Sequence, residues 1–197
     1  MSLTSLLAFN IAILGALIVP GPAFLTLLRT SLARGRTAGL ACAAGLALAA
    51  TMWSGAAVLG LHVLFALVPW AYLALKLGGA AYLIWLAVGL WRDAAAPLRP
   101  IARPGHGFRT GLTVNLSNPK AVFFIAAIFS TVFPVMPRGE TALALLANHF
   151  ALELTWYSTA ALVLTTAPMR AGYLRIKLWI DRISAATLTL IALRAAA

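Results

Sequence analysis

Glu153 is the residue whose type and position most directly indicate chemistry, because it is the one carboxylate far inside a long apolar segment. If that segment spans a membrane, the charge costs about 3 kcal/mol, so it is retained where it pairs, exchanges a proton or binds a ligand. On a helix, His149 lies one turn before Glu153, and Trp156 and Tyr157 lie one turn after it, so they share a face. We interpret Glu153 as a proton-coupling residue; a structural carboxylate paired with a buried cation or hydroxyl is the alternative.

Two proline-centred segments, Pro20-Gly21-Pro22 and Asn118-Pro119-Lys120, interrupt apolar runs in the two halves of the chain. Proline has no amide hydrogen, so a regular helix cannot continue through either segment. In a membrane, the freed backbone groups are tolerated only where protein or a hydrated cavity satisfies them. Breaks in corresponding positions of two halves are typical of a binding site between the repeats of a secondary transporter.

Polar residues gather at the second break, where Asn115, Ser117, Asn118 and Lys120 surround Pro119. Asparagine side chains can satisfy the orphan amides of a helix start, and a lysine ammonium can hold an anionic group there. A capped helix end with an interfacial lysine is the alternative. The matching break in the first half favours a binding site.

The composition predicts an integral membrane protein. Of its residues, 62% are hydrophobic and 10% are charged, and the mean hydropathy is +0.96, which is outside the usual soluble range. The length of 197 residues accommodates about six spans of roughly 20 residues each. The single cysteine, Cys42, excludes an intramolecular disulfide.

Stretches with few charges place the spans, and the basic residues between them set the orientation. We expect helices over residues 3–28, 38–61, 64–91, 112–135, 141–166 and 179–194. All but three of the 15 Lys and Arg residues then fall on one face, the exceptions being Lys76, Arg138 and Arg194. The positive-inside rule makes this face cytoplasmic, with both termini outside the plasma (inner) membrane. The net charge of +11 therefore reflects topology and contact with anionic lipid, and no nucleic-acid partner is expected.

A proline- and glycine-rich linker over about residues 93–110 divides the single transmembrane domain, residues 1–197, into two groups of three helices, about 1–92 and 111–197. Because three is odd, the second group enters the membrane from the opposite face. The predicted fold is an all-α membrane protein of about six transmembrane helices, built as two inverted repeats with proline-broken helices 1 and 4. Such repeats are a common basis of alternating access.

Small residues at four-residue spacing, Ala41, Gly45 and Ala49, precede Trp53 on the second expected helix. This spacing lets helix backbones approach closely. We interpret the stripe as a packing seam rather than a substrate path.

The sequence resembles the LysE/RhtB family over nearly its whole length. The resemblance is carried, in order, by residues 20–22 (PGP), 39–60 with Trp53, 76–83 (KLGGAAYL), 115–121 (NLSNPKA), 153–156 (ELTW) and 179–182 (WIDR). Residues 59–62 (LGLH), 128–130 (IFS) and 169–173 (MRAGY) are most similar to the threonine and homoserine exporter branch.

The resemblance implies export of small neutral amino acids, such as threonine or homoserine, in exchange for protons. A zwitterion needs donors for its carboxylate and acceptors for its ammonium, and the two ends of a broken helix present both. We expect Glu153 to take the ammonium or the coupled proton. The lysine and asparagines at the second break would hold or gate the carboxylate, and two tryptophans would be cavity walls. The expected substrate-binding residues are Pro20, Gly21, Pro22, Trp53, Asn115, Asn118, Pro119, Lys120 and Trp156.

Three positions differ from what is frequent in the resembled family. Ala23 follows the first break where Asp or Asn is common, Ala49-Ala50 replaces Gly-Asp, and Phe129-Ser130-Thr131 replaces Pro-Gln-Phe. The loss of these polar groups is expected either to shift substrate preference towards smaller or less polar molecules or to abolish activity.

Other classes of protein make different demands on the sequence. An ion or metal transporter of a related inverted-repeat fold would need clustered carboxylates or thiols within the spans, and only Glu153 lies there. An intramembrane enzyme would need paired aspartates, a serine–histidine arrangement, a metal site or two cysteines, so we expect no enzyme activity and no cofactor or metal. A degenerate, non-transporting protein would tolerate the breaks without requiring them. The sequence leaves open whether the chain forms a homo-oligomer.

Overall fold

The computed structural model describes residues 1–19, 21–61, 77, 81, 84–85, 87–89, 91–96 and 107–196, most of which are helical, with no strand among them. Pro20 and most of the third expected helix, residues 64–91, lie outside these residues. The elements with assigned bounds are α1 (Leu3–Ile18), α2 (Pro22–Ala56), the short π-helix η1 (Ala57–Leu61), α5 (Gly107–Leu116), α6 (Pro119–Val132), α7 (Gly139–Leu164) and α8 (Ala167–Ala196).

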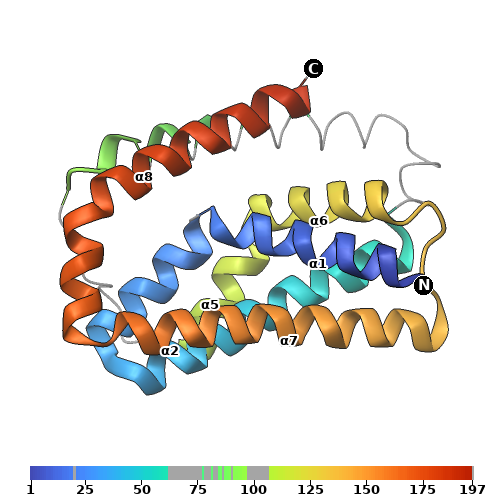
Figure 1. The fold of residues 1–197 in the computed structure, drawn as a ribbon, viewed down its shortest axis with the longest axis horizontal. Helices are drawn as coiled ribbons and strands as arrows, with labels where there is room; N and C mark the ends of the chain where they lie inside the picture. Colours follow the sequence, from blue (N-terminus) through green and yellow to red (C-terminus); the bar gives the residue numbers. More distant parts are fainter. Residues whose placement is uncertain are drawn as a thin grey trace.

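The first expected helix, residues 3–28, is divided between α1 and α2 in the structure. α1 ends at Ile18, and α2 begins at Pro22, where a missing amide hydrogen costs nothing because the first turn has no partner for it. α2 continues through residues 29–36, which were predicted as a basic loop, and leaves helical geometry at Gly35, with φ of 78°. Glycine adopts this conformation without steric strain, so one residue is enough to bend the chain (Figure 1).

The fourth expected helix, residues 112–135, is divided as well. α5 ends at Leu116, α6 begins at Pro119, and the two helices are bent by 60°. The side chain of Asn118 caps α6 by accepting a hydrogen bond from the backbone N–H of Lys120 at 3.2 Å. α5 begins at Gly107, which lies inside the predicted linker.

Glycines bring α2 and α5 into close contact. A Cβ atom at Gly45 would collide with the carbonyl oxygen of Phe108, and one at Gly111 would collide with that of Cys42. The stripe around Gly45 is therefore a helix–helix contact, which confirms the packing-seam interpretation.

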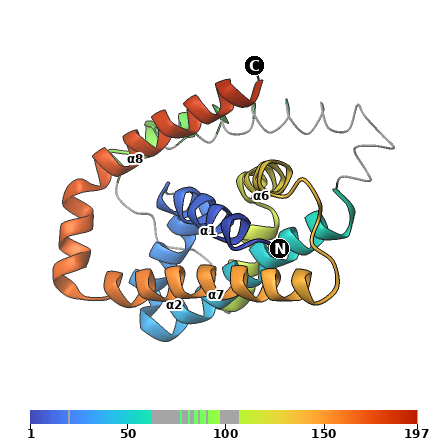
Figure 2. The same cartoon turned by 45° about the vertical axis from the view of Figure 1, so that its right-hand side comes forward.

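α8 corrects the prediction of a basic loop before residue 179. It is helical from Ala167 onwards and includes the basic residues of that segment. Lysine and arginine are good helix formers, so their charge marks a hydrated surface without ending a helix. Figures 1 and 2 show α8 bent and running outside the group formed by the other labelled helices.

A buried lysine attaches α8 to the preceding part of the chain. Lys177 Nζ donates to the carbonyl oxygens of Asp93 and Ala94, both at 3.0 Å, and to Asp181 Oδ2 at 2.7 Å. These three acceptors match the three hydrogens of the ammonium group. The guanidinium of Arg182 lies 5.2 Å from the centre of the Trp91 ring on the same segment.

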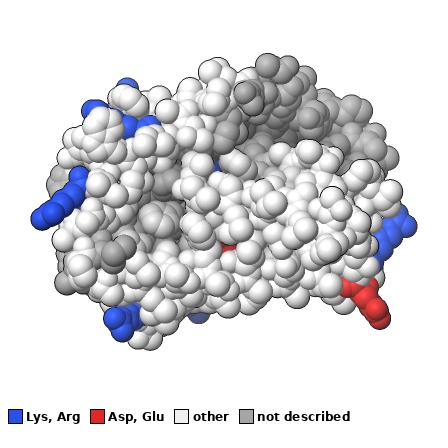
Figure 3. Space-filling view, in the orientation of Figure 1, with Lys and Arg blue, Asp and Glu red and all other residues white. Residues whose placement is uncertain are grey.

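The face of the molecule seen in Figure 3 is mostly uncharged in its middle. Most of the Lys, Arg, Asp and Glu side chains visible on this face lie near the two ends of the long axis. Large apolar residues are exposed, including Ile11 on α1 (70%) and Leu143 on α7 (68%). By length and composition, Pro22–Gly60 can cross a membrane, and the bent pair Gly107–Leu116 and Lys120–Val132 makes a second candidate among the described helices. Six spans and an inverted repeat stay predictions.

Candidate functional site

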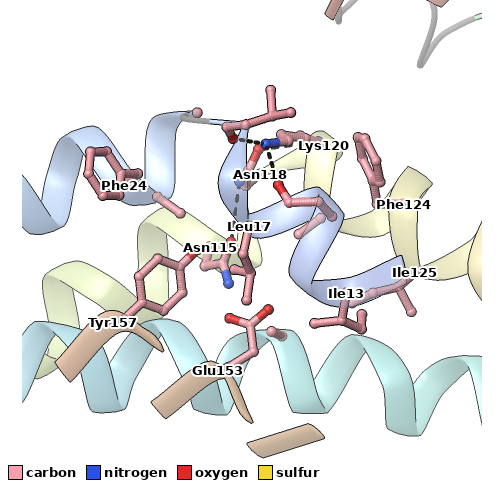
Figure 4. Close-up of a pocket in the computed structure, with 16 residues that line it drawn as sticks. Ile13, Leu17, Phe24, Asn115, Asn118, Lys120, Phe124, Ile125, Glu153 and Tyr157 are labelled. Carbon is pink, nitrogen blue, oxygen red and sulfur yellow. Dashed lines mark hydrogen bonds between the residues drawn. The ribbon is translucent and has the colours of Figure 1, made fainter. Parts of the chain in front are cut away.

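A cavity of about 50 Å³ lies where the two proline breaks approach α7. It is lined by the end of α1, the start of α2, the α5–α6 break and one face of α7. Figure 4 shows Lys120 and Glu153 reaching it from opposite sides. The cavity therefore has a cationic and an anionic group at its two ends.

Lys120 closes the end of the cavity at the first break. Its ammonium donates to the carbonyl oxygens of Ala16 at 3.2 Å and Val19 at 2.5 Å, and it lies 5.5 Å from the centre of the Phe124 ring (Figure 4). The carbonyls at the end of α1 have no intrahelical partner, so a cation there is favourable. Gly21 leaves room for the lysine, since a Cβ atom there would lie 3.1 Å from Lys120 Cδ.

Asn115 and Asn118 hold the second break against α2. Asn115 Nδ2 donates to the carbonyl oxygen of Leu46 at 2.8 Å, and Asn118 Nδ2 donates to Asn115 Oδ1 at 3.2 Å (Figure 4). Asn118 Oδ1 accepts the capping hydrogen bond at the start of α6. The two side-chain amides therefore hold the break in position, and they also line the cavity.

Glu153 approaches the cavity from α7 and is only 6% exposed. Its Oε1 lies 3.5 Å from His149 Nε2, and its Oε2 is buried with no hydrogen-bond partner among the described residues. His149 Nδ1 and Ser54 Oγ are 2.8 Å apart. A buried carboxylate oxygen without a partner is costly, so this oxygen is suited to accept a hydrogen bond from a ligand.

The walls between the two charged ends are apolar. Ile13 and Leu17 come from α1, Ala23 and Phe24 from the start of α2, and Ile125 from α6. Ala50 and Tyr157 complete the wall between α2 and α7. Between the two charged ends, these walls favour the uncharged, apolar part of a small ligand.

The structure brings together about half of the predicted site. Gly21, Asn115, Asn118, Lys120 and Glu153 line one cavity. Pro22 begins α2 and Pro119 begins α6, so each marks a helix start beside it, whereas Pro20 is not among the described residues.

The two predicted tryptophan walls lie elsewhere. Trp53 Nε1 donates to the carbonyl oxygen of Asn115 at 3.4 Å. Its indole therefore contacts the backbone of the second break and does not line the cavity. Trp156 lines a separate open groove on α7 with Leu14 and Thr155. Residues 153 and 156 are three apart, which a helix turns by about 300°, so the two side chains diverge by about 60° and can serve different surfaces.

Several contributors to the cavity were not predicted from the sequence. The carbonyl oxygens of Ala16 and Val19 carry no side-chain signal, since any residue type supplies one. Tyr157 lies one turn after Glu153, and this spacing placed it on the same helix face, but it was not among the expected binding residues. Ala50 and Ala23 were noticed only as departures from a family pattern.

Comparison with known proteins gives a consistent family. The model of the LysE type translocator family matches residues 14–197. The threonine efflux protein of Escherichia coli (strain K12) is 32% identical over 175 residues, covering 84% of each chain. The homoserine/homoserine lactone efflux protein of Salmonella typhimurium is 33% identical over 150 residues, covering 72% of this chain and 73% of that protein. No solved structure matches significantly.

Proposed function

The chain belongs to the LysE type translocator family, and from this premise we propose that it exports small neutral amino acids from the cytoplasm in exchange for protons. The named relatives, which move threonine and homoserine, support this substrate class. The protein is a membrane protein like these relatives. Its proposed place is the plasma membrane, with the basic segments cytoplasmic and both termini outside.

The observation that carries the proposal is the pairing of opposite charges across one small cavity. Lys120 and the start of α2 provide a positive end, and Glu153 provides a negative end (Figure 4). The N-terminus of a helix carries partial positive charge and exposed amides, which suit a carboxylate. An amino acid can therefore lie with its carboxylate towards Lys120 and its ammonium towards Glu153.

Lys120 acts in this proposal as a gate as well as a ligand. Its ammonium binds the carbonyls of Ala16 and Val19, so the cavity is closed at that end. A substrate carboxylate would draw the ammonium away from these carbonyls, because a charge-assisted hydrogen bond to an anion is stronger than one to a neutral carbonyl. Release of the end of α1 would then accompany binding, which links the substrate to movement at the break.

The proposed antiport assigns Glu153 two states. The ionised carboxylate binds the ammonium group of the amino acid on its way out. The carboxyl group carries a proton while the empty transporter returns. Because Glu153 cannot bind the ammonium group and the proton at the same time, the two are exchanged. In the proposed architecture, two inverted three-helix repeats alternate around this site.

Efflux from proteoliposomes tests the proposal. Vesicles loaded with labelled threonine, homoserine, alanine or valine should release at least one of them faster when the opposite side is more acidic. Glu153→Gln should lose the response to the pH gradient. Lys120→Ala should weaken apparent substrate affinity by about ten- to a hundredfold, since a charged hydrogen bond contributes about 1.5–3 kcal/mol, whereas Lys120→Arg keeps the charge and should lose less.

Two results would contradict the proposal in different ways. Absence of efflux for every amino acid by folded wild-type protein would exclude the exporter function. Efflux by Glu153→Gln that still responds fully to the gradient would remove Glu153 from the coupling role while leaving export intact.

A further inference from the structure

We propose that His149 is a second proton-carrying residue, which delivers protons to Glu153 and is held in position for this by Ser54. The inference rests on the proposed exchange of amino acid for protons. It adds a residue that does not line the substrate cavity and that the substrate need not contact.

The geometry places one imidazole between a hydroxyl and a carboxylate. His149 is 0% exposed, its Nδ1 is 2.8 Å from Ser54 Oγ, and its Nε2 is 3.5 Å from Glu153 Oε1. The ring also packs edge-on against Phe9, with 5.4 Å between the ring centres. Both nitrogens are therefore directed at groups that exchange protons, and the aromatic contact fixes the plane of the ring.

Burying a histidine that served only to fill space would cost folding free energy. A hydrogen-bonded glutamine or an apolar residue could fill the space without introducing a titratable group among apolar side chains. His149 Nε2 has no hydrogen bond among the described residues, since 3.5 Å to the carboxylate is long. A contact of this length is suited to shortening when the proton moves, as hydrogen bonds at working sites often tighten only in the active complex.

The proton step balances within the pair. An imidazolium at His149 transfers its Nε2 proton to the Glu153 carboxylate, which leaves a neutral imidazole and a neutral carboxyl group. Ser54 accepts from or donates to Nδ1 as the tautomer requires, so the nitrogen remains satisfied in each state. No oxidant, reductant or metal takes part.

The surroundings favour transfer in one direction. His149 comes one turn before Glu153 on α7, which in the proposed orientation places it nearer the outside, where protons enter. Few charged or titratable groups face the pair among the residues that the structure describes. Lys120 reaches the cavity from α6, and Tyr157 follows on α7. α2 contributes Ser54 and α1 contributes Phe9, neither of which is charged.

The test separates proton-driven transport from exchange. His149→Gln should lose the acceleration of efflux by a pH gradient. The same variant should retain exchange of labelled for unlabelled amino acid at equal pH, because exchange needs no net proton movement. Ser54→Ala leaves the imidazole in place without its partner and should lose part of the acceleration. If wild type shows both activities and His149→Gln retains both, the inference is wrong, although export itself stands.

A second measurement on the transporting protein covers the case in which His149→Gln does not fold. Replacing the other two histidines, His62 and His106, by glutamine leaves His149 as the only histidine, whose protonation can be followed by nitrogen NMR. We expect it to change over the pH interval in which a gradient accelerates efflux, and to respond to Glu153→Gln. An imidazole that stays in one protonation state throughout that interval would overturn the proposal.

Discussion

Glu153 and Lys120 have opposite charges in one cavity, yet each is bound to something other than its counterpart. Lys120 is held by carbonyl oxygens of α1, and Glu153 faces His149 with one oxygen while the other has no hydrogen-bond partner among the described residues. A direct ion pair would neutralise both groups and fill the cavity. Keeping them apart leaves each charge available to one end of a zwitterion.

Ala23 offers a prediction about selectivity at the residue scale, because it lines the cavity at the start of α2. An apolar wall cannot strongly distinguish threonine from valine, which have nearly the same shape, whereas a hydrogen-bonding wall can. We therefore expect wild type to move valine at least as well as threonine, and Ala23→Asn to favour threonine by about fivefold, corresponding to one hydrogen bond of about 1 kcal/mol. Competition between the two labelled amino acids measures this ratio.

Ala23→Val is the matched control, since it adds similar volume without a polar group. If Ala23→Val and Ala23→Asn change the ratio equally, volume rather than polarity determines selectivity at this position.

At the scale of helices, the second break is positioned by the packing of α5 on α2. Gly45 and Gly111 permit the two backbones to touch, and Asn115 then reaches the carbonyl oxygen of Leu46. Asn118 extends this contact to the start of α6, and Lys120 extends it to the end of α1. The two breaks are thus joined by one continuous set of contacts that begins at a glycine seam.

Gly45→Ala and Gly111→Ala test the importance of this seam. Each adds a methyl group that meets a backbone atom of the facing helix, which cannot move aside as a flexible side chain can. We expect overpacking to cost about 1–3 kcal/mol and to lower the midpoint of thermal unfolding of the detergent-solubilised protein.

Gly172→Ala on α8 provides the comparison, because a Cβ atom there has no atom within 4 Å. It should leave the midpoint unchanged or raise it, since alanine is favoured over glycine inside a helix by about 0.5–1 kcal/mol. Equal midpoints for Gly45→Ala and Gly172→Ala would show that close approach of α2 and α5 is unimportant for stability.

For the whole molecule, the distribution of charge predicts the orientation in the membrane. On the face shown in Figure 3, most charged side chains lie near the two ends of the long axis. The basic residues are concentrated in segments that the sequence assigns to the cytoplasmic side. Single cysteines introduced by Ser2→Cys or Ala196→Cys into a Cys42→Ser background should react with an impermeant thiol reagent added outside intact cells. Reaction of both termini only after access to the cytoplasm would reverse the assigned orientation.

A reporter at the bend of α2 provides the opposite expectation in the same assay. Arg36→Cys lies in a basic segment assigned to the cytoplasmic side, so it should be protected in intact cells and react once the membrane is opened. If Arg36→Cys and Ser2→Cys react from the same side, the segment between these two positions does not cross the membrane an odd number of times.

The sequence by itself determined the membrane class, the helical fold, the family and the residues that carry charge into the cavity. The membrane class and the helical fold follow from the apolar composition, and the charged residues of the cavity from their positions beside a proline or within an apolar segment. The family follows from motifs that occur in a specific order along the chain. The helix ends were less predictable, because Lys and Arg in residues 29–36 and at the start of α8 were interpreted as loops although both are good helix formers.

Only the tertiary structure decided which groups meet. Lys120 binds the carbonyl oxygens of Ala16 and Val19 more than a hundred residues away, and Ser54 meets His149 across two helices. Trp53 and Trp156 turn to other surfaces. The physical reason is that every residue carries a backbone carbonyl, so the sequence does not mark the ones that bind. In addition, packing against neighbouring helices sets the rotation of each helix about its axis. The proline breaks indicate where the site lies, and the contacts between helices determine which atoms line it.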